Sequence, residues 1–106
     1  MVFLDPGAII PEAKLTRYLL VLLPKDDKSK FLAQAGYTIA NWQQLEQDLR
    51  TQILPRLAIA TENTKFGQKY QIDGVLSGSN GAELRVRTVW IVTAQETRFV
   101  TLVPGG

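Results

Sequence analysis

The first half of the chain carries apolar side chains at helical spacing. A helix entry is predicted at Ile10-Pro11-Glu12, because proline suits the first turn and an acid there complements the partial positive charge of a helix start. Apolar positions from Ala13 to Leu19 then follow one helical stripe. Residues 20–23 are apolar without a break, which fits the end of a helix as well as a buried strand. We predict a helix from Pro11 to about Leu19 and leave residues 20–23 open.

A second helix is predicted after Pro24. Either Asp26 or Asp27 can cap its start, since a short acidic side chain accepts hydrogen bonds from the free amides of the first turn. Gly36 is expected to end it, because glycine tolerates the left-handed conformation found after many helices. Its inner side is predicted to hold Phe31, Leu32 and Ala35.

The third helix has the clearest pattern. Asn41 is predicted as its N-terminal cap, and Pro55 lies just beyond its end. Apolar residues recur at helical spacing and define its inner face: Trp42, Leu45, Leu49 and Ile53. Polar residues are predicted to point outward: Gln43, Gln44, Gln47, Asp48 and Gln52.

After Pro55 the pattern changes from helical to alternating. Gly67–Ser77 alternates as a half-buried strand does, and the loop Ser77–Gly81 is rich in residues that suit a hairpin turn. Leu84–Thr93 is rich in β-branched side chains, and Thr97–Val103 follows after the short turn Ala94–Glu96. These segments predict an antiparallel β-meander of three or more strands.

Helices followed by a meander indicate an α+β fold, with about three N-terminal helices packed on the C-terminal antiparallel sheet. We expect a single domain over residues 1–106, with an irregular lead-in at 1–9, a helical part at 10–55 and the sheet at 67–104. Trp42 and Trp90 occupy apolar periodic positions and are predicted in the core. The helices would cover one face of the sheet and leave the other at least partly open.

Composition removes several classes of function. The 106 residues contain neither cysteine nor histidine, which excludes disulfides, thiolate metal sites and histidine acid–base chemistry. The motifs for phosphate-binding loops, dinucleotide binding, zinc proteolysis and serine hydrolysis are absent from the sequence. No apolar stretch is long enough to span a membrane, and no signal-peptide pattern is visible, so a cytoplasmic protein is expected. A net charge of +2 requires any polyanion to bind at a cluster of basic residues.

Five charges lie within Lys25–Lys30, and two interpretations of them remain open. The acids can cap the second helix while the lysines are solvated, or the lysines at the helix start can form a site for a phosphate-sized anion. Because lysines surround the pair Asp26-Asp27, this pair is a poor metal site, and we expect neither a metal nor a cofactor.

Arginines recur on the meander. Arg85 and Arg87 share one face of their strand, and Arg98 on the next strand can join them. Guanidinium groups on an open sheet face can hold a phosphodiester through paired hydrogen bonds, although arginines also keep such faces soluble. We therefore name Arg85 and Arg87 as candidate substrate-binding residues.

Six segments resemble a family of small, uncharacterised bacterial proteins that is abundant in cyanobacteria. They are Lys14–Leu20, Lys28–Tyr37, Asn41–Arg50, Gly67–Gly81, Val86–Trp90 and Arg98–Pro104. That family in turn resembles the ribonuclease toxins of the barnase, EndoU, colicin and RelE-type fold. Lys28 and Phe31 match a lysine and an aromatic residue of a stretch found in related toxin modules, while the histidine of that stretch and its following glycine are missing here.

The resemblance implies a toxin-like, metal-independent endoribonuclease, paired with a small antitoxin-like protein. Toxins of this class often use Lys, Arg, Thr, Ser or Tyr in place of histidine. The resemblance nominates as catalytic residues Lys14, Lys28, Thr88, Arg98 and Thr101. Lys28 or Lys14 would transfer protons, and Arg98, with Arg87, would hold the phosphate. Thr88 and Thr101 would orient it, and all five nominated side chains would converge on one phosphate position.

Two other functions remain open at the level of sequence. The missing histidine and near-neutral charge favour a domain that has kept the fold, lost the chemistry and binds a small partner protein through a sheet edge or the open face. A weak RNA-binding domain without cleavage is the third, and it would require a basic stripe.

Overall fold

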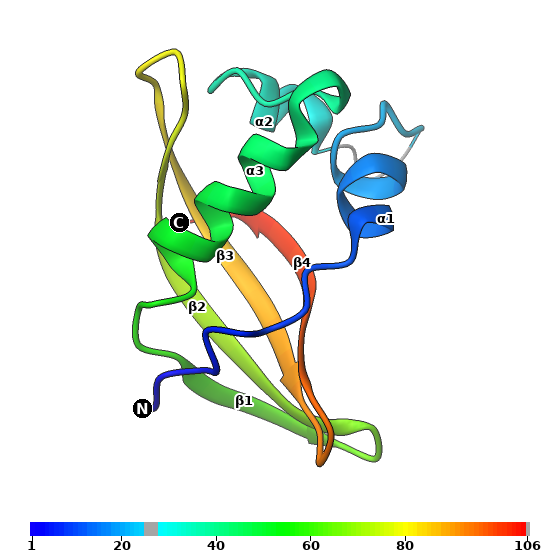
Figure 1. Cartoon of the computed structure of the whole chain (residues 1–106), viewed down its shortest axis with the longest axis vertical. Coiled ribbons are helices and arrows are strands. Elements are labelled where there is room, and N and C mark those ends of the chain that lie inside the picture. The colour runs from blue at the N-terminus through cyan, green and yellow to red at the C-terminus, as the bar shows by residue number, and fades with distance from the viewer. Residues whose placement is uncertain (25–27, 106) are drawn as a thin grey trace.

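The computed structural model describes residues 1–24 and 28–105 and confirms the α+β architecture (Figure 1). The helical elements are α1 (Glu12–Lys14), η1 (Leu15–Leu19), α2 (Ser29–Ala33), η2 (Ile39–Asn41), α3 (Trp42–Asp48) and η3 (Leu49–Ile53). The strands are β1 (Ile59–Thr64), β2 (Gly67–Ser77), β3 (Glu83–Val92) and β4 (Thr97–Pro104). α1 runs directly into η1, and α3 into η3, so each pair forms one continuous helical segment whose second part is a π-helical turn.

The four strands form one antiparallel sheet in the order β1-β2-β3-β4. The meander β2-β3-β4 is as predicted, whereas β1 was not predicted. Residues 59–63 of β1 are exposed, so the burial that produces an alternating sequence pattern is missing. Main-chain pairing with β2 defines this strand instead.

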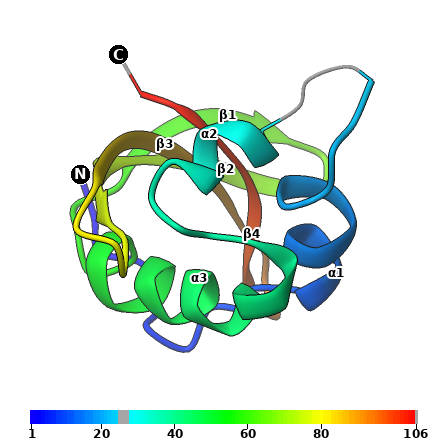
Figure 2. The ribbon, with the colours of Figure 1, turned by 90° about the horizontal axis from the view of Figure 1, so that it is seen from above.

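The core lies between one face of the sheet and the helices (Figure 2). The segment α3–η3 crosses that face, η3 packs against β2, and α1 lies beside β4 (Figures 1 and 2). Trp90 and Phe99 meet edge to face at 5.2 Å in the centre, and Trp90 is fully buried as predicted, while Trp42 is half-buried. The helix and strand residues fully buried around them are Leu15, Leu19, Leu32, Leu45, Leu49, Ile53, Ile72, Leu76 and Leu102.

The first two helices largely follow the prediction. The first ends at Leu19, and residues 20–23 form neither helix nor strand. The second ends as expected, with Gly36 in the left-handed region at φ +86°. Leu32 and Ala35 are buried, and Phe31 packs partly against the core. The predicted caps Asp26 and Asp27 lie outside the described residues.

The third helix differs from the prediction in its cap and in its outer face. Asn41 ends η2 and occupies the N-cap position of α3 as predicted, but its side chain makes no capping hydrogen bond to α3. That side chain accepts a hydrogen bond from Thr38 N and donates one to Gly36 O instead. Asp48, predicted to point outward, is buried. Its carboxylate accepts hydrogen bonds from the hydroxyl of Tyr37 at 2.6 Å and from Gln44 at 2.9 Å. The two donors allow this acid to occupy a helix face that would otherwise require an apolar residue.

The environment of Tyr37 raises the pKa of its phenol from an ordinary value of 10.0, through burial, the hydrogen bond to Asp48 and the negative charge of Asp48. Above pH 10 the unfolded chain therefore loses this proton while the folded chain keeps it, and stability falls as the pH rises. We expect Tyr37→Phe to lower the free energy of unfolding by about 1–3 kcal/mol at pH 9, because the buried Asp48 carboxylate loses a hydrogen-bond donor.

The loss of stability caused by Tyr37→Phe should shrink by about 1 kcal/mol between pH 10 and pH 11, since only the wild type loses this pH-dependent stability. Urea unfolding of both proteins at pH 8, 9, 10 and 11 measures this difference in the free energy of unfolding. Tyr70→Phe is the control, because the Tyr70 hydroxyl has no hydrogen-bond partner in the described part of the chain. A deficit that stays constant with pH would contradict the assignment.

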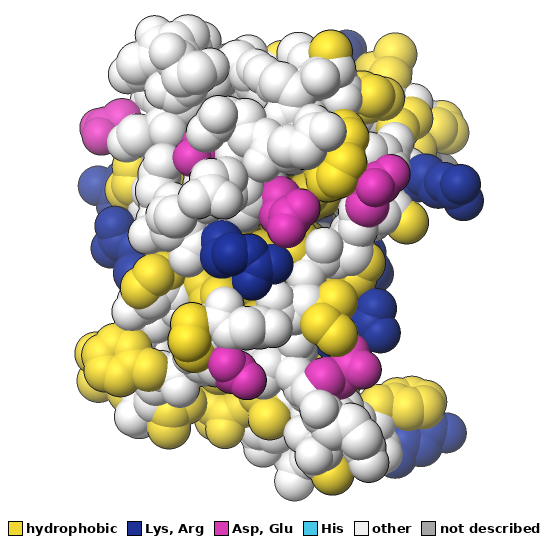
Figure 3. Space-filling view, viewed as in Figure 1, with side chains coloured by type: hydrophobic (Ala, Val, Ile, Leu, Met, Phe, Trp, Pro, Cys, Tyr) yellow, Lys and Arg dark blue, Asp and Glu magenta, His cyan; other side chains and the backbone are white. Residues whose placement is uncertain are grey.

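The N-terminal lead-in contains no strand but is bound to the rest of the molecule at three places. Val2 bridges Ala58 before β1, Ile9 bridges Arg98 on β4, and Arg50 donates to the carbonyl of Ala8 at 2.8 Å. Ile9 thus covers part of the β4 edge. On the helix side of the molecule, basic and acidic side chains are interspersed without a large patch of one sign (Figure 3).

Candidate functional site around Lys28 and Thr101

The sheet face opposite the helices, called here the open face, carries most of the predicted site residues. Strand register places Thr101 opposite Val89, Arg87 opposite Val103 and Arg98 opposite Ile91. Arg87, Val89 and Ile91 alternate with buried neighbours along β3 and so share the open face. Their partners on β4 project to the same side, because the register shifts by one residue between Phe99 and Thr101. Thr101 therefore lies between the two arginines along this face.

Lys28 reaches Thr101 from the helical half of the chain. Its ammonium donates a hydrogen bond to the Tyr18 hydroxyl at 2.9 Å and one to Thr101 Oγ1 at 3.4 Å. It also lies 4.8 Å from the centre of the Tyr18 ring, within the range of a cation–π interaction. Lys28, Tyr18 and Thr101 thus form a cluster, called here the Lys28 cluster, in which a half-buried ammonium is fixed beside two hydroxyl groups.

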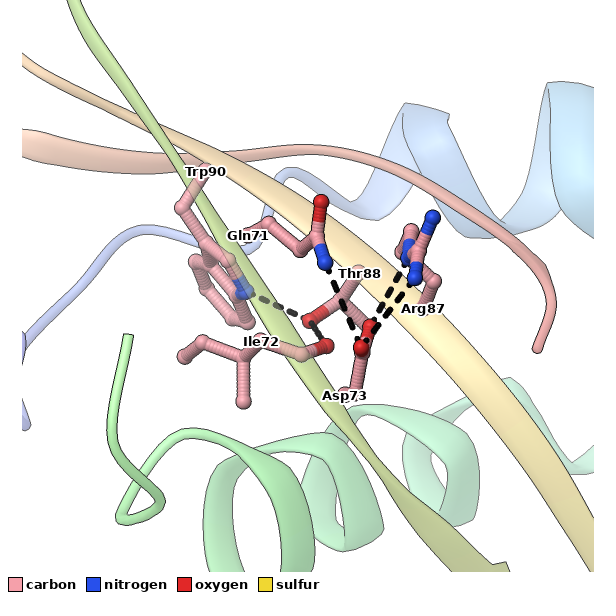
Figure 4. A network of polar contacts seen from close by, with 6 residues as sticks. All are labelled: Gln71, Ile72, Asp73, Arg87, Thr88 and Trp90. Carbon is pink, nitrogen blue, oxygen red and sulfur yellow. Dashed lines mark hydrogen bonds and ion pairs between the residues drawn. The ribbon is translucent and has the colours of Figure 1, made fainter. Parts of the chain in front are cut away.

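The two arginines on either side of Thr101 each lie beside a carboxylate. Arg87 Nε lies 2.9 Å from Asp73, and the hydrogen bond from Arg87 lowers the pKa of Asp73 while the pKa of Arg87 is raised (Figure 4). Arg98 Nε lies 3.3 Å from Oε2 of the half-buried Glu96, and this buried oxygen makes no hydrogen bond within the described residues. The ion pair between Arg87 and Asp73 is exposed, and such pairs contribute about 0–1 kcal/mol, so a phosphate can displace the Asp73 carboxylate.

Thr88 does not share this face. It pairs with Leu102 and is fully buried on the helix side, where its hydroxyl donates to Ile72 O at 3.0 Å and accepts from Trp90 Nε1 at 2.7 Å (Figure 4). Arg87 and Thr88 are adjacent in the chain, and adjacent strand residues project to opposite sides. The five nominated catalytic residues therefore do not converge on one phosphate position, and the structure gives Thr88 a place in the core.

Thr88→Val is expected to lower the free energy of unfolding by about 1–3 kcal/mol, because the buried Trp90 N–H loses its acceptor. Thr88→Ser keeps the acceptor and should retain most of that stability. Urea denaturation followed by Trp fluorescence measures both variants. A Thr88→Val protein as stable as the wild type would contradict the role assigned to this hydroxyl.

Lys14 and Arg85 make no hydrogen bond to the Lys28 cluster within the described residues. Lys14 is half-buried one turn before Tyr18 on the segment α1–η1. Arg85 is exposed on the open face, four residues before Val89 and so about 13 Å away along β3. Within the described residues, neither side chain has a hydrogen bond or an ion pair.

Tyr18 was not recognised as a candidate from the sequence. It lies in the apolar stripe of the first helix and was assigned to its inner side. The signal that could have found it is the phenol itself, since a tyrosine among leucines needs a polar partner for its hydroxyl. That partner is Lys28, ten residues later.

The site contains cations and hydroxyls but no metal ligands. In residues 1–24 and 28–105, no group of three or more acidic side chains could hold a metal ion. In the same residues, every helix is too short or too polar to cross a bilayer.

The fold and this cluster define a small α+β domain with cationic and hydroxyl side chains on an open sheet face. A family model described as a domain of unknown function, DUF6883, matches residues 6–106, and the chain belongs to this family. Comparisons with curated proteins and with solved structures gave no match.

Proposed function

We propose that this domain is a metal-independent endoribonuclease of a toxin–antitoxin type, with its reaction centre at the Lys28 cluster. The observation that carries the proposal is the position of the Lys28 ammonium, 2.9 Å from the Tyr18 hydroxyl and 3.4 Å from that of Thr101. Two residues nominated by resemblance to ribonuclease toxins, 73 positions apart in the chain, meet at one place. Tyr18 adds a residue type that such toxins use when histidine is missing.

RNA cleavage without a metal needs a base, an acid and a cation. The 2′-oxygen attacks phosphorus after losing its proton, the bond from phosphorus to the 5′-oxygen breaks, and that oxygen gains a proton. In this site Lys28 is the cation beside the phosphate and, as an ammonium, the acid that protonates the 5′-oxygen. The hydroxyls of Tyr18 and Thr101 donate hydrogen bonds to phosphate oxygens.

Two further groups complete the proposed mechanism. Lys14, one turn before Tyr18, is the candidate base, and only its uncharged form can accept the 2′-proton. Arg98 and Arg87 lie on either side of Thr101 on the open face, and Arg87 can exchange its exposed partner Asp73 for phosphate oxygens.

The test is incubation of the purified domain with an end-labelled RNA in the presence of a chelator. We expect shortened fragments ending in a 2′,3′-cyclic phosphate, and an all-DNA strand of the same sequence should stay intact because it lacks the 2′-hydroxyl. Intact RNA after long incubation with a high concentration of correctly folded protein would refute the proposal.

A second candidate function is a catalytically inactive domain that binds a small protein. It is favoured by β1, an edge strand of the sheet that follows directly after the bridge between Val2 and Ala58. The exposed apolar residues around this bridge are Met1, Phe3, Leu57 and Ile59. An unpaired strand edge with apolar neighbours is a common place for a partner strand.

Co-expression separates the two candidates. The family resemblance implies a very small protein encoded by the adjacent gene. An inactive domain should co-purify with that protein and be harmless when expressed alone. A ribonuclease should be toxic alone, and toxicity that Lys28→Ala relieves would eliminate the inactive domain.

A further inference from the structure

A pocket of about 260 Å³ lies beside the second half of β2 and the first half of β3, next to Gly105 near the C-terminus. It is lined by Arg56, Asp73, Gly74, Val75, Arg85, Val86 and Gly105. Arg85 and Val75 face each other across β2 and β3 on the open face. Gly105, which donates its N–H to the Arg85 carbonyl at 2.8 Å, closes the opposite side.

Arg56 enters this pocket from the helix side. It follows η3, and its Nε donates to the Gln52 carbonyl at 2.8 Å. Its aliphatic part packs over Gly74 on the helix side of β2, where an added Cβ would lie 2.9 Å from Arg56 Cδ and Nε and from Ile53 Cδ1. β1 pairs with β2 only as far as Gln71, so the edge of β2 beside Gly74 is not covered by β1. Glycine at position 74 leaves the room that the Arg56 side chain occupies beside the pocket.

The lining has an excess of positive charge. Among the described residues, the Arg85 side chain makes no hydrogen bond or ion pair, and the Arg56 side chain makes one hydrogen bond, from Nε. The terminal nitrogens of both guanidinium groups are therefore available to a ligand. The one acid of the lining, Asp73, is already paired with Arg87 at 2.9 Å. Two available guanidinium groups beside a neutralised carboxylate suit a phosphate, since arginine presents paired donors to its oxygens.

We propose that this pocket binds a phosphate group of RNA, as a second subsite on the strand whose cleavage is assigned to the Lys28 cluster. The inference rests on the proposed function for its ligand. Arg85 is about 13 Å from the level of Thr101 along the open face, so one strand can reach both places. Arg56 and Arg85 hold the RNA and take no part in the chemistry.

The test measures RNA affinity and RNA cleavage separately. A short fluorescent single-stranded RNA is titrated by anisotropy at several salt concentrations into wild type, Arg56→Ala, Arg85→Ala and Gly74→Ala, each in the Lys28→Ala background to prevent cleavage. Arg17→Ala is the matched control, because Arg17 on η1 is an exposed arginine that forms no ion pair with any described residue.

We expect Arg56→Ala and Arg85→Ala each to weaken RNA binding about tenfold and to reduce the slope of log K against log salt by about 0.7. Gly74→Ala should also weaken RNA binding, because its methyl group displaces the Arg56 side chain, and it should in addition destabilise the fold through its contact with Ile53 Cδ1. Arg17→Ala should change affinity less than about twofold. In a parallel NMR titration, inorganic phosphate should shift the Nε–H signals of Arg56 and Arg85.

The outcomes distinguish this inference from the proposed function. Unchanged RNA affinity in Arg56→Ala and Arg85→Ala overturns the subsite, even if the wild type cleaves RNA. If phosphate shifts the arginine signals while RNA affinity stays unchanged, the pocket belongs to a free phosphate compound and the RNA subsite is likewise overturned. RNA that binds through both arginines but is never cleaved supports the subsite and refutes the nuclease.

Discussion

Replacing Lys28 by alanine is expected to reduce the rate of RNA cleavage at least about a hundredfold, the usual cost of removing one preorganised group that stabilises transition-state charge. The ammonium of Lys28 is fixed by the Tyr18 hydroxyl and the Thr101 hydroxyl before any substrate arrives. It therefore needs little reorganisation as negative charge develops on the phosphate. Single-turnover cleavage of labelled RNA measures the loss.

The matched control is Lys30→Ala. Lys30 is exposed on α2, two residues after Lys28, and carries the same charge on the same short segment. Its removal lowers the net charge equally but should leave the rate within about twofold. Equal losses in the two variants would show that the charge of the region acts on RNA binding alone and would remove Lys28 from the chemistry.

Lys28→Arg separates the two roles proposed for the lysine. Arginine keeps the positive charge but does not give up a proton at any ordinary pH. This variant should bind RNA with nearly wild-type affinity and still cleave it slowly. Wild-type rates in Lys28→Arg would show that Lys28 acts as a cation without donating a proton.

The helices and the meander were predictable because burial leaves a period in the sequence. Leu45, Leu49 and Ile53 are buried as their helical spacing indicates, and β3 alternates because one face of it is buried. β1 has no such period, since its residues are exposed and its partner is the main chain of β2. Asp48 was misplaced for a related reason: two side-chain donors, Tyr37 and Gln44, satisfy it in the interior.

The candidate site was predictable only in part. Alternation along a strand placed Arg85 and Arg87 on one face, and the same rule requires Thr88 on the other. The resemblance nominated Thr88 without regard to this rule. Lys28, at the start of α2, contacts Thr101 on the edge strand β4. No local sequence pattern encodes a contact between two residues so far apart in the chain. Tyr18 became visible as a partner only once that contact was known.

The contact between the hairpin loop and α2 gives the largest expected effect on stability. An alanine Cβ at position 78 would lie 1.9 Å from the carbonyl oxygen of Ala35 and 2.6 Å from its Cβ, far inside the contact distance of real atoms. Gly78 cannot move away easily, because its N–H donates to Ala82 at 2.9 Å and its carbonyl accepts from Gly81 at 3.0 Å. The loop is also tied to the end of α2 by Asn80, which donates to the Gln34 carbonyl at 3.1 Å.

We therefore expect Gly78→Ala to lower the free energy of unfolding by about 3 kcal/mol or more, since the backbone of the loop or of α2 must shift. Gly81→Ala is the control in the same loop. No atom lies within 4 Å of its added Cβ, and its cost of about 1–2 kcal/mol comes from the φ of +87° alone. Urea unfolding of both variants gives the comparison. If Gly78→Ala costs no more than Gly81→Ala, the hairpin loop does not pack against Ala35 after α2.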